Sequence, residues 1–321
     1  MRPTTSPKIL MRILKFLVAG LLVLQSMVAI AQFVPPGITP SETVKIADGL
    51  YSFRWGAYRS LFMVTEEGVI VTDPLSPEAA SAYRQAIAEI TPLPVKYVVY
   101  SHSHWDHARG GQIFKAEGAR FVAQQRCLTN MLESPDPDIV LPDISFNDHY
   151  SVKLGKQSLD LYYFGPSHGT CLIAMIPRPH KILYTVDLVT PRPAGGGYLP
   201  WDPQVADFHF NNAVANLRAL EDLAVKEELT SVIGAHLVPL PQGKGQFAAA
   251  APVGPISTVR ERREFWEGIM AAVKAEMDSG TESFMVSSRL DLSPWQNIRG
   301  FNKRKFKQLI DRIAAYYAIG R

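Results

Sequence analysis

The first half of the chain alternates between two apolar patterns. Between residues 44 and 73, apolar and polar residues alternate, which predicts a series of strands because successive side chains of a strand point to opposite faces. From 77 to 90 the apolar residues recur at helical spacing, which predicts a helix. A short β-branched and aromatic run at 95–100 then predicts a buried strand, and residues 108–117 are expected to continue as a helix.

The second half repeats this order. Apolar runs predict strands ending near His168, Asp187 and His236, and an amphipathic helix is marked by Ala213, Leu217, Leu220 and Ala224. The tail after about residue 256 is predicted to be helical. Thr258 and Glu261 form a capping-box pattern at the start of its first helix, and Gly320 closes the last one. Because strands followed by a helix occur twice, we expect two β-rich halves, each covered by helices on one side.

The amino terminus has the composition of a secretory signal peptide. Four basic residues precede an apolar run from about 16 to 30, and Ala29-Ile30-Ala31 is a small-residue cleavage pattern. A membrane anchor is the alternative, but the run is short for a span and is interrupted by Gln25 and Ser26. We therefore expect residues 1–31 to be cleaved. The mature domain, 32–321, is expected to be periplasmic or secreted, without a stable membrane anchor.

Charge argues against a nucleic-acid partner. The chain of 321 residues has a net charge of +3, and loss of the four basic residues before position 32 changes it to −1. The local basic run Lys303-Arg304-Lys305 is expected to be a solvated helix face. We expect a small-molecule substrate, and the oligomeric state stays open.

The two cysteines leave two possibilities open. Export would permit a disulfide between Cys127 and Cys171, but two residues do not make a disulfide framework, and we expect each to be a buried, small apolar residue. Cys171 follows His168 by three positions and is a less favoured candidate for metal binding.

The largest cluster of candidate metal ligands follows the strand predicted at 95–100. His102, His104, Asp106 and His107 lie within six residues, where open α/β sheets place their ligands. On an extended chain His102, His104 and Asp106 would face one way, and His107 would turn to a second centre. Imidazole and carboxylate without thiolate suit zinc or a similar divalent ion.

Three further ligand candidates stand at predicted strand ends: His168, Asp187 and His236. Strand ends of one sheet edge can meet, so the sequence offers five histidines and two aspartates, enough for two divalent ions. The remaining histidines are weaker candidates. His149 and His180 are expected at the surface, and His209 is expected to pack against or cap a helix rather than touch substrate. Trp105, Tyr198 and Trp201 could line an apolar pocket or belong to the core.

The ordered set His102-x-His104-x-Asp106-His107, His168, Asp187 and His236 resembles the metallo-β-lactamase-fold hydrolases, and the resemblance covers about Val44 to His236. It implies an α/β fold, a four-layer αβ/βα sandwich, here with a C-terminal helical extension. It implies one Zn²⁺ on His102, His104 and His168, a second on Asp106, His107 and His236, and Asp187 bridging both. Asp73 matches the family's first motif and would hold the metal loop by hydrogen bonds.

The bridging Asp187, where class B1 β-lactamases carry cysteine in the late ligand region, is closer to the glyoxalase-II, lactonase and alkylsulfatase branches. The resulting hypothesis is hydrolysis of a small ester, lactone, lactam or thioester by a metal-bridging hydroxide, with Asp106 orienting the hydroxide and assisting proton transfer. Alternatives are alkylsulfatase or phosphodiesterase chemistry, a mononuclear iron dioxygenase acting on thiol-derived substrates, and a non-catalytic metal-binding module.

Overall fold

The computed structural model describes residues 34–191, 207–298 and 301–320. The predicted signal peptide, Tyr198 and Trp201 lie outside these ranges. Within the ranges described, no helix combines the length and the apolarity needed to cross a bilayer.

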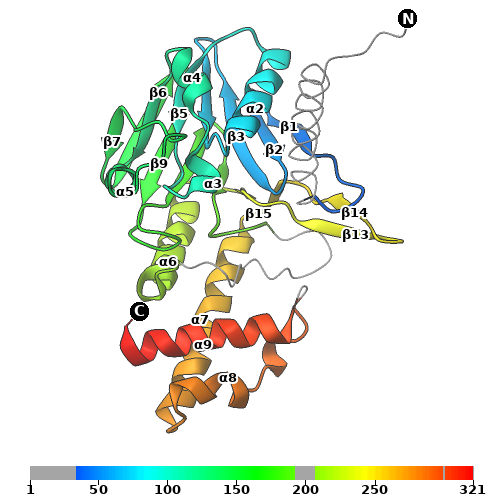
Figure 1. The fold of residues 1–321 in the computed structure, drawn as a ribbon, viewed down its shortest axis with the longest axis vertical. Helices are drawn as coiled ribbons and strands as arrows, with labels where there is room; N and C mark the ends of the chain where they lie inside the picture. Colours follow the sequence, from blue (N-terminus) through cyan, green and yellow to red (C-terminus); the bar gives the residue numbers. More distant parts are fainter. Residues whose placement is uncertain (1–33, 192–206, 299–300, 321) are drawn as a thin grey trace, which may run out of the picture.

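Two mixed β-sheets form the centre of the fold (Figure 1). The first has seven strands in sequence order: β1 (Ser41–Ala47), β2 (Leu50–Trp55), β3 (Tyr58–Val64), β4 (Val69–Thr72), β5 (Val95–Val99), β6 (Arg120–Gln124) and β7 (Ile144–Phe146). Strands β1 to β4 pair antiparallel and β4 to β7 pair parallel. The parallel part matters most here, because its carboxyl ends lie at one edge.

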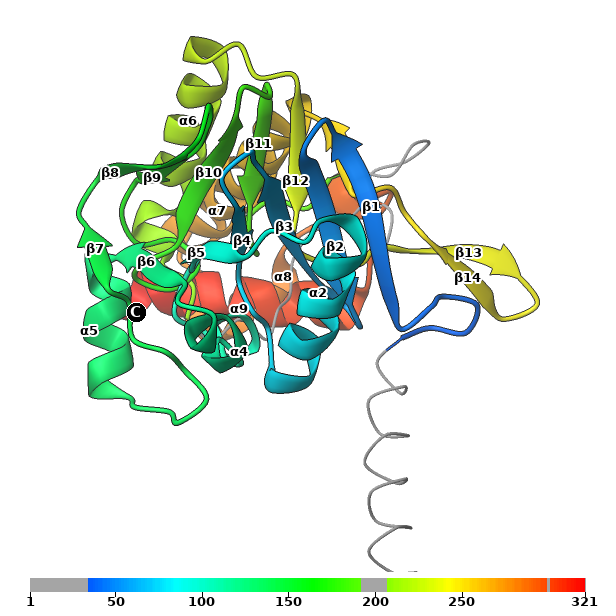
Figure 2. The same ribbon diagram turned by 90° about the horizontal axis from the view of Figure 1, so that it is seen from above.

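The second sheet has six strands in the order β15-β12-β11-β10-β9-β8. Their bounds are β8 (His149–Leu154), β9 (Gln157–Tyr163), β10 (Ile173–Arg178), β11 (Ile182–Thr185), β12 (Ser231–Gly234) and β15 (Val253–Pro255). A separate hairpin, β13 (Pro239–Gly243) and β14 (Gln246–Ala249), extends away from the body in both ribbon views (Figures 1 and 2). This hairpin was not predicted from the sequence.

Helices cover the outer face of each sheet. The helices before residue 134 are α2 (Pro77–Ile90), α3 (Trp105–Ala108), α4 (Gln112–Ala116) and α5 (Gln125–Glu133). The later ones are α6 (Phe210–Lys226), α7 (Ser257–Asp278), α8 (Val286–Arg289) and α9 (Lys303–Ile319), with short 3-10 turns at Ser283–Met285 and Ser293–Trp295. Figure 2 shows α2 and α4 on one side of the sheets and α6 and α7 on the other.

The buried side chains confirm this layering. One cluster, containing Tyr83 of α2 and Phe62 of β3, fills the space between the first sheet and its helices. The larger cluster joins the inner faces of both sheets and continues to α6, α7 and α9, with Ile70, Met175 and Leu217 among its members. The predicted four-layer αβ/βα sandwich with a C-terminal helical extension is therefore confirmed, and burial of these apolar faces is its main stabilising term.

Two local predictions were wrong, and one helix was not predicted. Residues 108–117 do not form one helix, because Gly110, at φ +90°, separates α3 from α4. Thr258 does not cap α7, since the helix already begins at Ser257 and Thr258 is buried in its first turn. Residues 125–133 form α5, a helix for which no prediction was made.

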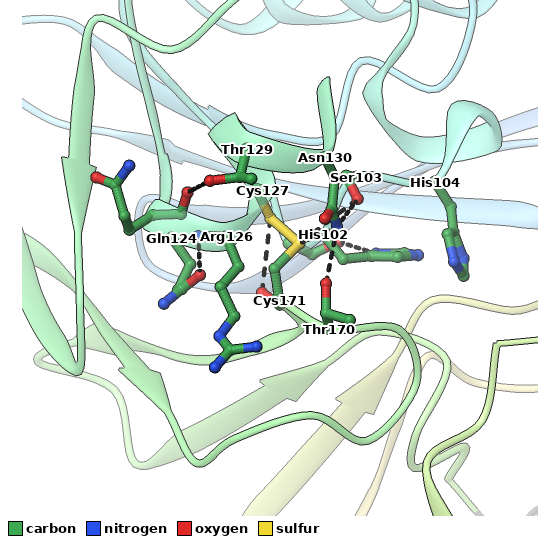
Figure 3. Close-up of a disulfide and its surroundings, with 12 residues drawn as sticks. His102, Ser103, His104, Gln124, Arg126, Cys127, Thr129, Asn130, Thr170 and Cys171 are labelled. Carbon is green, nitrogen blue, oxygen red and sulfur yellow. Dashed lines mark hydrogen bonds between the residues drawn. A yellow bond between two sulfur atoms is a disulfide. The ribbon is translucent and has the colours of Figure 1, made fainter. Parts of the chain in front are cut away.

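The expectation that the cysteines are separate apolar residues was also wrong. Cys127 and Cys171 form a disulfide, with Cα atoms 5.3 Å apart (Figure 3). Both are buried, as predicted. The pair forms because α5, which follows β6 of the first sheet, lies against the segment that precedes β10 of the second. Cys171 is consequently excluded as a free thiolate ligand.

Candidate metal centre

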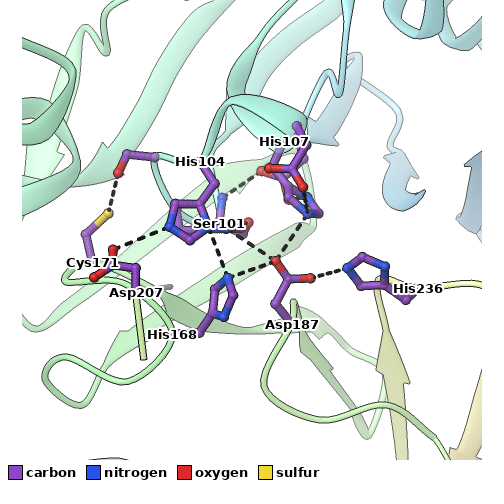
Figure 4. A network of polar contacts seen from close by, with 12 residues as sticks. Ser101, His104, His107, His168, Cys171, Asp187, Asp207 and His236 are labelled. Atoms are coloured by element: carbon purple, nitrogen blue, oxygen red, sulfur yellow. Dashed lines mark hydrogen bonds and ion pairs between the residues drawn. The ribbon is translucent and has the colours of Figure 1, made fainter. Parts of the chain in front are cut away.

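The ligand candidates gather where strands of both sheets end. His102 and His104 follow β5, and His107 is on the short helix α3. His168 lies between β9 and β10, and Asp187 and His236 follow β11 and β12. The buried strands fix where these segments leave the sheets, so side chains up to 134 positions apart in the sequence, as His102 and His236 are, converge. Figure 4 shows His104, His107, His168 and His236 around Asp187.

Four of these side chains form the first group: His102, His104, His168 and Asp187. Nε2 of His168 lies 3.0 Å from Nδ1 of His104 and 3.3 Å from Oδ2 of Asp187. Nε2 of His102 lies 3.4 Å from the same Asp187 oxygen. His104 thus faces the group with Nδ1, whereas His102 and His168 face it with Nε2.

The second group consists of His107, His236 and again Asp187. Nε2 of His107 lies 3.3 Å from Asp187 Oδ2, and Nε2 of His236 lies 2.5 Å from Asp187 Oδ1. Asp187 therefore contacts both groups, one carboxylate oxygen facing His102, His107 and His168 and the other facing His236. Its backbone has φ +58°, a conformation that non-glycine residues rarely adopt and that often marks functional positions.

Asp106 lies outside both groups. It does not continue an extended chain with His102 and His104, as predicted, because the backbone enters α3 at Trp105. Its Oδ2 lies 4.0 Å from Nε2 of His107, and its side chain is 47% exposed. The structure therefore brings together six of the seven predicted ligands and places the seventh at the rim.

Burial and charge act differently on the two groups. Burial lowers the pKa of His102 well below its usual value, and burial together with the neighbouring His168 lowers the pKa of His104. Burial would also lower the pKa of His107, but the carboxylates of Asp187 and Asp73 outweigh it and raise that pKa well above the usual value. Burial opposes ionisation of Asp187, yet His107 and His236 hold its pKa well below its usual value.

The donor set fits divalent metal ions. Nε2 of His102 and Nε2 of His107 are buried and make no hydrogen bond, although each points toward Asp187. Tetrahedral zinc with bonds of about 2.0–2.1 Å places neighbouring ligand atoms about 3.3–3.4 Å apart, close to the separations at Asp187 Oδ2. Imidazole and carboxylate are also ligands that zinc prefers.

A second layer of polar residues orients the ligands. Asp73 is buried, accepts a hydrogen bond from the Ser101 backbone N–H at 2.8 Å, and places its other oxygen 3.6 Å from Nδ1 of His107. Nδ1 of His102 lies 2.9 Å from the Ser101 hydroxyl. On the opposite side of the centre, Asp207 Oδ2 lies 3.4 Å from Nε2 of His104. Asp207 was not predicted, because a lone aspartate carries no pattern in the sequence.

The three remaining histidines lie outside both groups of candidate ligands. His149 is exposed, and His180 lies at a turn, where its Nε2 is 3.0 Å from the Asp48 carbonyl oxygen. His209 occupies the N-cap position of α6 but does not cap it, and its Nε2 lies 3.3 Å from Asp207 Oδ1.

A cavity of about 530 Å³ adjoins the first group and shares His104 with it. Trp105, Met131 and Ile139 give it apolar surface, and Asp106 and Asp207 give it polar surface. Trp105 is 47% exposed, which excludes the alternative that it belongs to the core. The guanidinium of Arg109 lies 4.3 Å from the centre of its ring.

Among the curated relatives of this chain, two match it over part of their length. The chain is 27% identical over 185 residues to the 2,4-dinitroanisole O-demethylase subunit alpha of Nocardioides sp. (strain JS1661), covering 56% of this chain and 54% of the relative. It is 28% identical over 142 residues to the metallo-beta-lactamase type 2 of Elizabethkingia meningoseptica, covering 40% and 55%. The chain thus spans about half the length of these relatives.

Solved structures share the fold. A metallo-beta-lactamase from Pontibacter korlensis superposes with a TM-score of 0.58 at 19% identity, over 71% of this chain and 99% of the other. The DIM-1 metallo-beta-lactamase superposes with a TM-score of 0.57 at 13% identity, over 73% and 98%. The model of the metallo-beta-lactamase superfamily matches residues 54–236, more than half of the chain and the segment that carries all seven predicted ligands. The chain therefore belongs to the metallo-beta-lactamase superfamily.

Proposed function

We propose that the chain is an exported hydrolase with two zinc ions that cleaves a small ester, lactone, lactam or thioester. The observation that carries the proposal is the convergence of six buried or half-buried ligands into two groups that share Asp187. His102, His104 and His168 would hold one ion, His107 and His236 the other, and Asp187 would contact both. The disulfide is compatible with an oxidising compartment such as the periplasm.

When bound, two divalent ions would supply Lewis acidity and lower the pKa of water enough for nucleophilic attack at neutral pH. Asp73 would fix the ring of His107, and Asp207 the ring of His104, so that the ligand nitrogens keep facing the centre. The exposed Asp106 carboxylate stands beside His107, where a rotation about its side-chain bonds would let Oδ2 join the centre or move a proton to the leaving group.

The chain's own residues would also bind the substrate. The cavity beside His104 offers the rings and alkyl groups of Trp105, Met131 and Ile139 to an apolar substituent. Neither cysteine can act as a nucleophile, because both are in the disulfide. Because bound divalent ions would activate water directly, no side-chain nucleophile is needed, and we expect no covalent acyl-enzyme.

A second candidate is cleavage of an aryl ether, favoured by similarity to the subunit of a 2,4-dinitroanisole O-demethylase. Dinitroanisole is an aryl methyl ether, so its activated aromatic carbon is an electrophile that could replace a carbonyl. Because the match covers only 54% of this relative, the test includes both acyl substrates and aryl ethers.

The test is metal analysis of the purified mature chain, combined with a panel of esters, lactones, lactams, thioesters, aryl ethers, sulfate esters and phosphodiesters. We expect two zinc ions per chain and turnover of at least one acyl substrate. His104→Ala should lose one ion and nearly all turnover, whereas His149→Ala, an exposed histidine on β8, should keep both.

Several results would redirect the proposal. Full metal content and an unchanged rate in His104→Ala would exclude the mechanism. One iron per chain with oxygen-dependent turnover would indicate a dioxygenase, and turnover confined to the sulfate esters or phosphodiesters would place the enzyme in that class. A zinc-loaded chain inert on the whole panel would indicate a binding module.

A further inference from the structure

The candidate metal centre is divided between the two sheets. His102, His104 and His107 follow β5 of the first sheet, whereas His168, Asp187 and His236 follow strands of the second. An ion in either group would therefore cross-link the two halves of the sandwich. Any other cross-link between the same halves changes the conformational cost of assembling that group.

The Cys127–Cys171 disulfide is such a cross-link, and it lies beside the first group. Cys127 is on α5, which follows β6 of the first sheet, and Cys171 is three residues after His168 in the second half. Sγ of Cys171 lies 3.6 Å from the hydroxyl of Ser103, the residue between His102 and His104 (Figure 3).

Hydrogen bonds join the same segments as the disulfide, and we call this set of contacts between α5, the loop after β5 and the loop before β10 the junction. The Asn130 side-chain amide, one helical turn after Cys127, donates to Ser103 Oγ at 3.0 Å and to Thr170 Oγ1 at 2.8 Å. The Ile173 N–H donates to the Ser101 carbonyl oxygen at 3.0 Å. The loops that carry His102, His104 and His168 are thus joined to each other and, through the disulfide, to α5.

The second group is held by different contacts. His236 lies on the opposite side of Asp187 from Cys171 (Figure 4). Its carbonyl oxygen accepts from the buried Arg59 guanidinium at 3.2 Å, and its backbone bridges to Tyr58. No residue of α5 takes part in these contacts of His236.

We propose that the Cys127–Cys171 disulfide is a positioning cross-link for His168, and that the metal affinity of the first group depends on it more than that of the second. With the disulfide intact, the His168 loop is held against the loop of His102 and His104 before an ion binds. Without it, the ion itself must order both loops, and that cost lowers affinity.

The test measures zinc affinity by competition with a chromophoric chelator, so it does not depend on whether the chain hydrolyses any substrate. His236→Ala removes a ligand of the second group and leaves the first complete, whereas His168→Ala removes a ligand of the first group and leaves the second complete. Each is measured oxidised and after reduction by a phosphine, in which the S–S bond breaks, two thiols form and the phosphine takes the oxygen of water to become its oxide. Thiol counting under denaturing conditions confirms that reduction is complete.

We expect reduction to weaken zinc binding about 10-fold or more in His236→Ala, a loss of the size seen when a partner that orients a ligand is removed, and to leave His168→Ala nearly unchanged. Adding Cys127→Ser and Cys171→Ser to each background should reproduce these results, and phosphine should then have no further effect. That control separates loss of the disulfide from chelation by the reductant.

Two outcomes would overturn the proposal: unchanged affinity of the first group after complete reduction, or equal weakening of both groups. Far-UV circular dichroism of the reduced chains checks that the fold persists. If the serine variants do not fold, Asn130→Ala removes the neighbouring bridge with the disulfide intact. It should weaken the first group alone, and an unchanged affinity in that variant would contradict the junction's role.

Discussion

Asp73 Oδ1 accepts a hydrogen bond of 2.8 Å from the backbone N–H of Ser101, the residue that begins the metal-binding segment. The other oxygen, Oδ2, makes no hydrogen bond and lies 3.6 Å from Nδ1 of His107. One buried carboxylate therefore fixes both the path of the loop and the ring of a ligand. Its charge is needed only at the second of these contacts.

Replacing Asp73 by asparagine should separate these two roles. Asp73→Asn keeps an oxygen that can accept from Ser101 but removes the charge beside His107, so we expect metal affinity of the second group to fall about 10- to 100-fold with little change in stability. Asp73→Ala should in addition lower the free energy of unfolding by about 1–3 kcal/mol, because the Ser101 N–H loses its acceptor.

Zinc titration and urea unfolding check these outcomes, and Asp48→Asn, at a fully exposed carboxylate, is the matched control. Equal metal affinities in Asp73→Asn and the unmodified chain would show that the charge plays no part.

Arg59 provides a separate test of the second group. Its buried guanidinium donates to the His236 carbonyl oxygen at 3.2 Å and approaches that of Gly234 at 3.5 Å. Burial lowers its pKa to about 10, so it stays charged at neutral pH. Arg59→Met should lower the free energy of unfolding by about 1.5–3 kcal/mol.

Because Arg59 acts through His236, Arg59→Met should also weaken zinc binding in His168→Ala, where the second group alone is complete, but not in His236→Ala. Arg59→Lys, which keeps the charge but has a single donor nitrogen in place of the planar guanidinium, should recover part of both losses. Weaker zinc binding by the first group after Arg59→Met would mean that the effect is a general loosening of the fold.

The sequence predicted the elements whose apolar spacing is regular. The helix at 77–90 and the strand ends bearing His168, Asp187 and His236 follow from burial of one face, which leaves a clear periodicity. α5 was missed because it is only nine residues long and buries only Cys127 and Met131, while Leu132 is exposed. The Asp207–His104 contact and the disulfide join residues 103 and 44 positions apart, and no local pattern encodes such pairs.

The placement of Asp106 shows a different limit. Alternation of side chains predicts its direction only while the chain stays extended, and α3 begins one residue before it. The sequence indicated which residue types could bind metal. The direction of each side chain depends on the local backbone conformation, which here is set by the packing of the buried His107 and Ala108 against the rest of the fold.

The opposite pKa shifts predict different pH dependence for the two groups. His102 and His104 have lowered pKa values, so they are already neutral near pH 7 and protons compete little with a metal ion there. His107 has a raised pKa, so it holds a proton near pH 7 that an ion must displace. Zinc affinity should therefore rise more steeply from pH 6 to 8 in His168→Ala, which keeps the second group, than in His236→Ala. Equal slopes would contradict this assignment.

Gly169, next to His168, tests how tightly the first group is packed. It has φ +70°, and a Cβ there would lie 3.3 Å from Asp207 Oδ2 and 3.5 Å from Nε2 of His104. Gly118 has a similar φ of +86° with no atom within 4 Å of the added carbon. Gly169→Ala and Gly118→Ala should therefore each lower the free energy of unfolding by about 1–2 kcal/mol through backbone strain, measured by urea unfolding.

Only Gly169→Ala should also weaken zinc binding in the His236→Ala background, because its added carbon displaces Asp207 from His104. Equal zinc affinities in the two alanine variants would mean that the Asp207–His104 contact does not orient the ligand.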